Sequence, residues 1–149
     1  MIRLLTILIV HLCCVLSQAQ QTSFKFDFGT DRTAKGYIPV TPLTKFTSQT
    51  GYGFDPGSIV TAVDNGGNPL SGDYITSNKP FYFSVKLPEG NYDVKLILGD
   101  TKGTSATTVR TECRRLMLEN IRTTKGKTTT QTFTVHVKDS LIRNAAGTV

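Results

Sequence analysis

Apolar and polar residues alternate with a period of two along most of this 149-residue chain. In the segment SFKFDFG (residues 23–29), three phenylalanines fall on one face, and Lys25 and Asp27 fall on the other. The segments 80–88 (PFYFSVKLP) and 92–99 (YDVKLILG) show the same alternation. A period of two is typical of strands that bury one face, and no comparable helical period follows residue 20. The pattern therefore predicts an all-β domain.

Short loops rich in turn-forming residues separate the expected strands. PEGN at 88–91 predicts a tight turn, so segments 80–88 and 92–99 are expected to form a hairpin. Segments 106–118 and 128–138 alternate in the same way, with Val109, Phe133 and Val135 among the inward residues. Many short strands with one apolar face predict two packed sheets, a β-sandwich of jelly-roll type.

Two regions fit this pattern less well. Residues 30–58 have weak periodicity and are expected to form an irregular excursion packed over one end of the sandwich. At the other end, SLIRNAAGTV stops at Val149 without a closing turn. Since an unpaired sheet edge is a liability, we expect the domain at 20–149 to lack its last strand and to be incomplete at the C-terminus.

The first twenty residues have the pattern of an export signal. Arg3 precedes an apolar run from Leu4 to Leu16, and small residues occupy Ser17 and Ala19. The run is short for a transmembrane span. We therefore expect a signal peptide at residues 1–19, a secreted or periplasmic mature protein, and no membrane attachment after cleavage.

The mature chain is basic and contains one cysteine. Without Arg3 it carries 16 Lys and Arg residues against 11 Asp and Glu residues, a net charge of +5. Such a surface could meet an acidic polysaccharide, since export argues against nucleic acid as a partner. The alternative is an ordinary solvated strand face. Cys113 is the remaining cysteine, so no intramolecular disulfide is expected.

The segment LILGDTKG at 96–103 raises the question of whether this chain contains a catalytic nucleophile. A Gly-Asp followed by a hydroxyl residue resembles the start of the GDSL-type nucleophile block, which would make Thr101 the nucleophile. Such a nucleophile needs a base and an orienting acid. The mature chain offers one histidine, His136, in a strand and without a DxxH arrangement. We therefore interpret residues 100–103 as a turn and assign no catalytic residue.

Metal binding has little support from spacing. Asp64, Asp73 and Asp100 lie in or beside loops and could hold a structural calcium ion with loop carbonyls. Their spacing does not match a dedicated calcium loop, and one histidine with one cysteine does not suit zinc. No metal site and no other cofactor is assigned.

Aromatic residues in the loops are a better indication of a ligand. Sugar rings present apolar faces that stack on aromatic rings, while acids, amides or arginines bind their hydroxyls. Tyr52 and Tyr74, with Asp73 at the rim, could form such a platform. The alternative is structural, with Phe54 and Tyr37 fixing the long loop onto the sandwich.

Several longer motifs occur together in this order: FDFG, GYGF, PEGNYDV and RRLMLE. As a set they resemble the N-terminal domain of bacterial rhamnogalacturonan acetylesterases, which are secreted pectin-degrading enzymes, over residues 23–149. The resemblance implies a galactose-binding-like and malectin-like β-sandwich that precedes an SGNH (GDSL-type) hydrolase domain. The catalytic serine, the oxyanion-hole residues and the DxxH block belong to that second domain and have no matching positions here.

Three functions follow as hypotheses. The leading one is a non-catalytic accessory domain of a pectin deacetylase that binds acidic pectic polysaccharide, with Arg110, Arg114 and Arg115 meeting carboxylates. Tyr52, Asp73 and Tyr74 complete the candidate site. A structural module that packs against a downstream esterase domain is the second, and a chain that is the carboxylic-ester hydrolase itself is the third.

Overall fold

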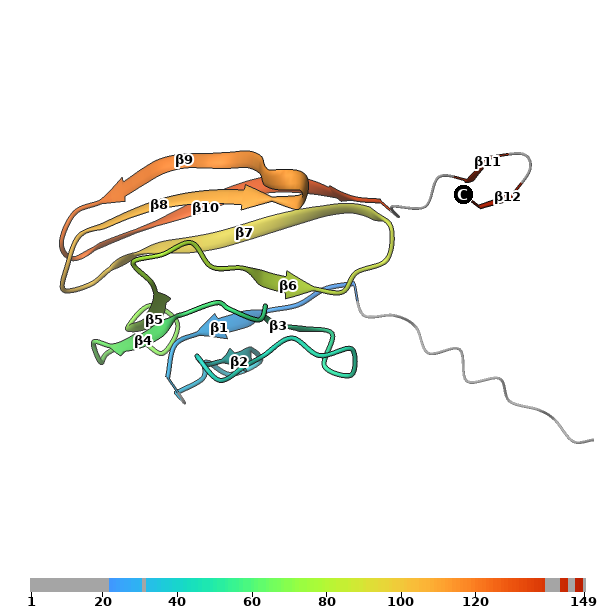
Figure 1. Cartoon of the computed structure of the whole chain (residues 1–149). Coiled ribbons are helices and arrows are strands. Elements are labelled where there is room, and N and C mark those ends of the chain that lie inside the picture. Colours follow the sequence, from blue (N-terminus) through green and yellow to red (C-terminus); the bar gives the residue numbers. More distant parts are fainter. Residues whose placement is uncertain (1–21, 31, 139–142, 145–146, 149) are drawn as a thin grey trace, which may run out of the picture.

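The computed structural model describes residues 22–30, 32–138, 143–144 and 147–148, and it consists of two layers of strands (Figure 1). Long strands form the upper layer and short strands the lower one. The lower layer contains β1 (Phe26–Phe28), β2 (Ile38–Val40), β3 (Tyr52–Phe54), β4 (Thr61–Asp64), β5 (Asp73–Thr76) and β6 (Phe83–Val85). The upper layer contains β7 (Gly90–Asp100), β8 (Ser105–Thr111), β9 (Arg115–Thr123) and β10 (Lys127–Val137).

The remaining elements are short. A single-turn 3-10 helix, η1 (Glu112–Arg114), links β8 to β9, and β11 (Arg143–Asn144) pairs with β12 (Gly147–Thr148). Within the described part of the chain, no helix has the length and hydropathy that a membrane span requires. The expected signal peptide at 1–19, Val149 and the side chain of Cys113 lie outside the description.

The longest pairing in the molecule joins β7 and β10. These antiparallel strands pair from Asp100 with Lys127 at one end to Gly90 with Val137 at the other. In β7 the inward residues, among them Val94 and Leu96, are half-buried, while their neighbours are exposed. The predicted alternation of this strand is therefore confirmed.

The predicted hairpin between segments 80–88 and 92–99 is wrong. β6 pairs with β3, and β7 pairs with β10. The PEGN segment instead carries the chain from the lower layer to the upper one (Figure 1). Here the Tyr92 hydroxyl donates a hydrogen bond of 2.9 Å to the carbonyl oxygen of Pro88. Tight-turn residues fix a change of direction, but they do not decide whether the next strand joins the same sheet.

The tightest part of the core is an aromatic cluster on the inner face of the lower layer. Phe54 and Val40 have no exposed surface. Around Phe54, neighbouring rings meet in tilted or edge-on pairs with centroids 4.8 to 6.3 Å apart, a favourable geometry for aromatic contacts. The cluster contains Phe26, Phe28, Tyr52, Phe54, Phe81 and Phe83.

Residues 30–58, which were expected to be irregular, contain two strands of this layer, β2 and β3. The expectation that Phe54 fixes the long loop onto the sandwich is confirmed, because β3 places its ring in the centre of the cluster. Asp27, on the strand face opposite the phenylalanines, is also buried. Asp27 is 5% exposed, and its carboxylate accepts a hydrogen bond of 2.7 Å from the Ala34 amide. That bond ties the following loop back onto β1.

Candidate functional site

The three lower-layer residues of the expected sugar site have separate structural partners. Tyr52 packs its ring against Phe26, with centroids 5.0 Å apart. Asp73 is 3% exposed and therefore offers no rim to a ligand. Tyr74 donates its hydroxyl to Asp100 at 2.7 Å. The structure does not bring these side chains together as one platform.

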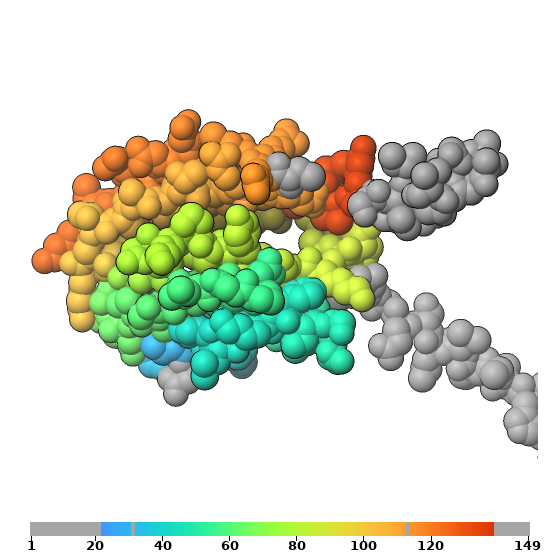
Figure 2. Space-filling view, viewed as in Figure 1, coloured from blue at the N-terminus to red at the C-terminus, as the bar shows by residue number. Residues whose placement is uncertain are grey.

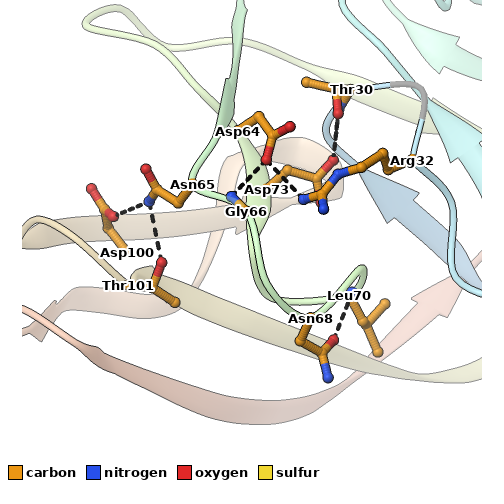
Figure 3. Close-up of polar contacts among 10 residues, drawn as sticks. All are labelled: Thr30, Arg32, Asp64, Asn65, Gly66, Asn68, Leu70, Asp73, Asp100 and Thr101. Atoms are coloured by element: carbon orange, nitrogen blue, oxygen red, sulfur yellow. Dashed lines mark hydrogen bonds and ion pairs between the residues drawn. The ribbon is translucent and has the colours of Figure 1, made fainter.

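Asp73 holds the end of β1 in place. Its Oδ2 accepts hydrogen bonds from the Thr30 amide at 2.8 Å and from the Thr30 hydroxyl at 2.9 Å (Figure 3). Gly29 allows this approach, because a Cβ there would collide with the Asp73 carboxylate. Burial of a charged group costs less when hydrogen bonds compensate it, as they do here at Oδ2, whereas the buried Oδ1 has no hydrogen-bond partner among the described residues. Asp73 is therefore a structural residue of this fold.

The register of β4 and β5 places Asp64 directly opposite Asp73. Two like charges in this position repel each other. Arg32 offsets that repulsion by forming an ion pair of 2.7 Å with Asp64 (Figure 3). Both partners are well exposed, so the pair adds about 1 kcal/mol or less to stability.

The acids considered for calcium do not converge. Asp64 is occupied by Arg32 and the Gly66 amide, while Asp100 belongs to a different network with Asn65 and Tyr74. Among the described residues, no group of three acidic, histidine or cysteine side chains could hold a metal ion. The structure therefore gives no support to the structural calcium considered from sequence.

Asp100 organises the turn that follows β7. Its carboxylate accepts hydrogen bonds from the Tyr74 hydroxyl, the Asn65 side-chain amide and the Lys102 backbone amide, each 2.7 Å long. The bond from Tyr74 and then the bond from the Lys102 amide lower the pKa of Asp100. Burial first, and then the hydrogen bond and charge of Asp100, raise the pKa of Tyr74 to about 12.

This network predicts a specific alkaline response. In the unfolded chain Tyr74 loses its proton near pH 10, whereas in the folded chain it keeps the proton to about pH 12. Its contribution to stability is therefore fully present below pH 10 and lost as the pH rises towards 12. Ultraviolet titration of the protein should show a late tyrosine transition that belongs to Tyr74. Tyr74→Phe should remove it, whereas Tyr82→Phe, at an exposed tyrosine, should leave it unchanged.

Thr101 and His136 are too far apart to act together. Asp100, which precedes Thr101, pairs with Lys127, and His136 pairs with Asn91 at the other end of the same ladder. Nine strand positions separate the two ends, which corresponds to about 30 Å. The Thr101 hydroxyl accepts a hydrogen bond of 3.2 Å from Asn65. The interpretation of residues 100–103 as a turn is supported by this placement.

The basic residues expected to bind carboxylates lie at the η1 corner, where β8 turns into β9. Arg110 donates a hydrogen bond of 3.2 Å from Nη1 to the carbonyl oxygen of Arg114. Arg114 itself has a φ of 63°, a left-handed conformation that places it at the tip of the turn. Arg115 then begins β9 and lines a pocket. The three arginines are therefore close in space, with Arg115 directed to a concave surface.

This pocket, which we call the corner pocket, combines charge with an apolar surface. Its volume is about 210 Å³. Its lining includes the charged or polar residues Glu112, Arg115 and His136 and the apolar residues Met117 and Val135. It is lined by Thr111, Glu112, Arg115, Met117, Thr134, Val135 and His136.

Hydrogen bonds position two of the lining side chains. His136 Nδ1 lies 2.5 Å from the Asn91 side-chain oxygen, an acceptor, so Nδ1 is the donor and Nε2 remains for other partners. The neighbouring Thr134 hydroxyl donates a hydrogen bond of 2.7 Å to Asp93. Both contacts run across the β7–β10 ladder. The rim of the pocket is therefore anchored on regular strands.

Most residues of the corner pocket were not candidates from sequence. Periodicity places Thr134 and His136 on a polar strand face, but it does not show that β8, η1 and β9 meet the end of β10. The contact depends on how two non-consecutive segments pack. The available sequence signals were the histidine His136 and the arginine-rich segment 110–115. Neither signal indicates how far apart the two lie in the fold.

The chain is similar to domains found in two kinds of larger protein. The family model described as "Beta-agarase/YXIM esterase-like, galactose-binding domain-like" matches residues 24–145. Beta-agarase A of Zobellia galactanivorans is 32% identical over 124 residues, which cover 79% of this chain and 22% of that protein. The uncharacterized esterase YxiM of Bacillus subtilis is 32% identical over 90 residues, which cover 56% of this chain and 23% of that protein.

A solved structure agrees with this similarity. The crystal structure of the YxiM protein from Bacillus subtilis matches with a TM-score of 0.60 and 28% identity, covering 77% of this chain and 32% of that one. The chain spans less than a quarter of the length of the two curated relatives. The expected galactose-binding-like β-sandwich, as found in an esterase, is confirmed. The chain belongs to the beta-agarase/YXIM esterase-like family of galactose-binding-like domains.

Proposed function

We propose that this chain is the carbohydrate-binding accessory domain of an exported polysaccharide-acting enzyme, and that its ligand is an acidic pectic chain. The corner pocket is the observation that supports this function. Relatives named as an agarase and an esterase contain domains of the same family, and in both the matched part is a minor share of the protein. The rhamnogalacturonan acetylesterase type of enzyme would supply the pectic context, and the expected signal peptide would supply export.

The chemistry of the pocket suits one uronate residue. The apolar face of the sugar ring would lie on Met117 and Val135, since such faces pack against apolar side chains. The guanidinium of Arg115 would bind the carboxylate, because its fork of donors matches the two carboxylate oxygens. Glu112 and His136 Nε2 would take the remaining hydroxyls. Arg110 and Arg114 add positive potential at the rim.

Calorimetric titration with digalacturonate tests this function. Arg115→Gln should weaken binding by about tenfold or more, since a charged hydrogen bond contributes about 1.5 to 3 kcal/mol. Lys79→Gln is the matched control, because Lys79 is exposed and lies in the lower layer. The methyl ester of the same disaccharide should bind as weakly as the acid does to Arg115→Gln. Equal binding of acid and ester would contradict an acidic ligand.

A second function has one observation in its favour. Ile59 and Tyr82 are 65% and 62% exposed, and their segments are joined by hydrogen bonds between Ser58 and Tyr82. An exposed apolar pair of this kind suits packing against a neighbouring domain of the same enzyme. In that case Tyr82→Ser would weaken the association of the domains in the whole enzyme and leave digalacturonate binding unchanged.

A further inference from the structure

Two turns with the same three residues lie beside each other at the end of the upper layer opposite the corner pocket. Thr101-Lys102-Gly103 follows β7, and Thr124-Lys125-Gly126 follows β9. A Cβ on Gly126, which has a φ of 77°, would lie 3.9 Å from the Thr101 carbonyl oxygen. Figure 2 shows both turns on the left-hand edge of the molecule. The fold thus brings a lysine from each turn to one edge.

Two further cations join these lysines. Lys127 begins β10 opposite Asp100, and Arg122 lies in β9 opposite Ala106. We call Lys102, Arg122, Lys125 and Lys127 the turn edge. All four residues are exposed. Within the part of the chain that the structure describes, none of the four forms an ion pair.

Two nearby acids, Asp100 and Glu119, offset part of this charge, but in the described part of the chain neither forms an ion pair with the four cations. Asp100 uses its carboxylate to accept hydrogen bonds from Tyr74, Asn65 and the Lys102 amide. Glu119 is exposed in β9, three positions before Arg122. Clustered unpaired cations raise the local concentration of anions. The turn edge therefore attracts an anionic partner.

A concave surface lies beside the cations. It has a volume of about 540 Å³ and an open, hydroxyl-rich lining. The hydroxyls of Ser105 and Thr123 are 2.8 Å apart and bind each other, so Thr104 and Thr124 are the more available ones. Hydroxyl donors beside cations suit carboxylate or sulfate oxygens. The lining residues are Thr104, Ser105, Ala106, Arg122, Thr123 and Thr124.

β9 joins this surface to the corner pocket. Arg115 begins the strand and Arg122 stands seven positions later, which corresponds to about 23 Å. Between them the exposed face of the β8–β9 hairpin carries Thr108 and Asn120, joined by a hydrogen bond of 3.1 Å. Leu116, which is 41% exposed, and the acidic Glu119 also lie between the two arginines, so the positive charge is confined to the two ends of the hairpin.

We propose that the turn edge is a second contact for the same anionic polysaccharide, one that a long chain reaches and a disaccharide does not. This inference rests on the proposed function of the corner pocket. Occupying both ends of β9 by one chain makes the second contact intramolecular, which raises the overall affinity without a new binding partner. The groups recognised are carboxylates or sulfates regularly placed along a polysaccharide.

Chain length separates the two contacts in an experiment. Long oligogalacturonides should bind the wild-type protein at least tenfold more tightly than digalacturonate. Replacing Lys102, Lys125 and Lys127 with glutamine should remove most of that gain, because the exposed charges that attract the far end of the chain are lost. The same variant should bind digalacturonate as the wild type does. A sulfated galactan of similar length shows whether sulfate replaces carboxylate.

The matched control changes the same charge elsewhere. Lys35, Lys79 and Lys86 are exposed residues of the lower layer. Their replacement with glutamine should leave the gain from chain length intact. If both triple variants lose the same share of the gain in affinity with chain length, net charge alone explains the gain, and the second contact is overturned. A wild-type protein that binds long and short chains equally would overturn it too. Absence of binding to either length would overturn the proposed function as well.

Discussion

Phe54→Ala should lower the free energy of unfolding by about 3 to 5 kcal/mol, one of the two largest effects expected here. Phe54 has no exposed surface, and its ring centroid lies 5.3 Å from that of Phe83 and 5.8 Å from that of Phe81. Removing the ring loses the free energy gained by transferring it out of water. It also leaves a cavity that the rigid aromatic neighbours fill poorly. Urea unfolding followed by circular dichroism measures the loss.

Two further variants make this result interpretable. Phe54→Leu keeps an apolar side chain in the cluster and should cost less than half as much as alanine. Leu43→Ala removes an apolar side chain that is 86% exposed and should change stability by less than about 0.5 kcal/mol. A loss below about 1.5 kcal/mol for Phe54→Ala would show that the aromatic cluster is not the main core.

Gly53→Ala should be comparably destabilising, by about 3 kcal/mol or more. Gly53 has a φ of 146°, a backbone angle that residues with a side chain rarely adopt. A Cβ there would also overlap the backbone of Lys45 and Phe46, which runs beside β3. Strain costs about 1 to 3 kcal/mol, and overpacking costs a similar amount. Because the obstacle is backbone, no side chain can move aside to relieve it.

Gly57→Ala separates these two causes. Gly57 also has a positive φ, 87°, but a Cβ there would meet no atom within 4 Å. Its replacement should therefore cost about 1 kcal/mol, from strain alone. Thermal unfolding of the two variants side by side gives the difference. Equal melting temperatures would mean that the approach of residues 45 and 46 to β3 is looser than described.

The period of two along the chain was sufficient to predict β7 and β10 of the upper layer. The single strand expected over 106–118 is wrong, because η1 interrupts it and β9 runs on to Thr123 with irregular burial. In β7 and β10 each inward residue is half-buried and each outward neighbour is exposed for most of the length. Long strands with one apolar face carry this information locally. The same reasoning assigned the correct fold class, because several such strands can bury their faces only against another sheet.

Pairing between strands could not be predicted from the same pattern. Segments 80–88 and 92–99 each have a strand period and a turn between them, yet the chain changes layer there. The lower layer was harder still, because its strands are three or four residues long. Such strands gain their stability from the aromatic cluster, whose contacts join residues far apart in sequence.

The site was only partly accessible to sequence reasoning for a related reason. Asp73 and Tyr74 are polar and lie near a loop, which suggested a ligand, but the fold uses them internally to bind Thr30 and Asp100. Arg115 was identified, whereas Glu112 and His136 were not assigned to its pocket. Internal and ligand-binding roles for a polar side chain look identical until its neighbours are known.

Mapping the binding surface is the most direct test of the proposed function. Backbone amide resonances of the labelled protein would be followed by nuclear magnetic resonance during titration with digalacturonate. The corner pocket predicts saturable shifts in Thr111, Glu112 and Arg115 of the β8–β9 corner and in Thr134 and His136 of β10, with the lower layer unaffected. Shifts centred on Tyr52 and Tyr74 of the lower layer, or no shifts at saturating ligand, would contradict it.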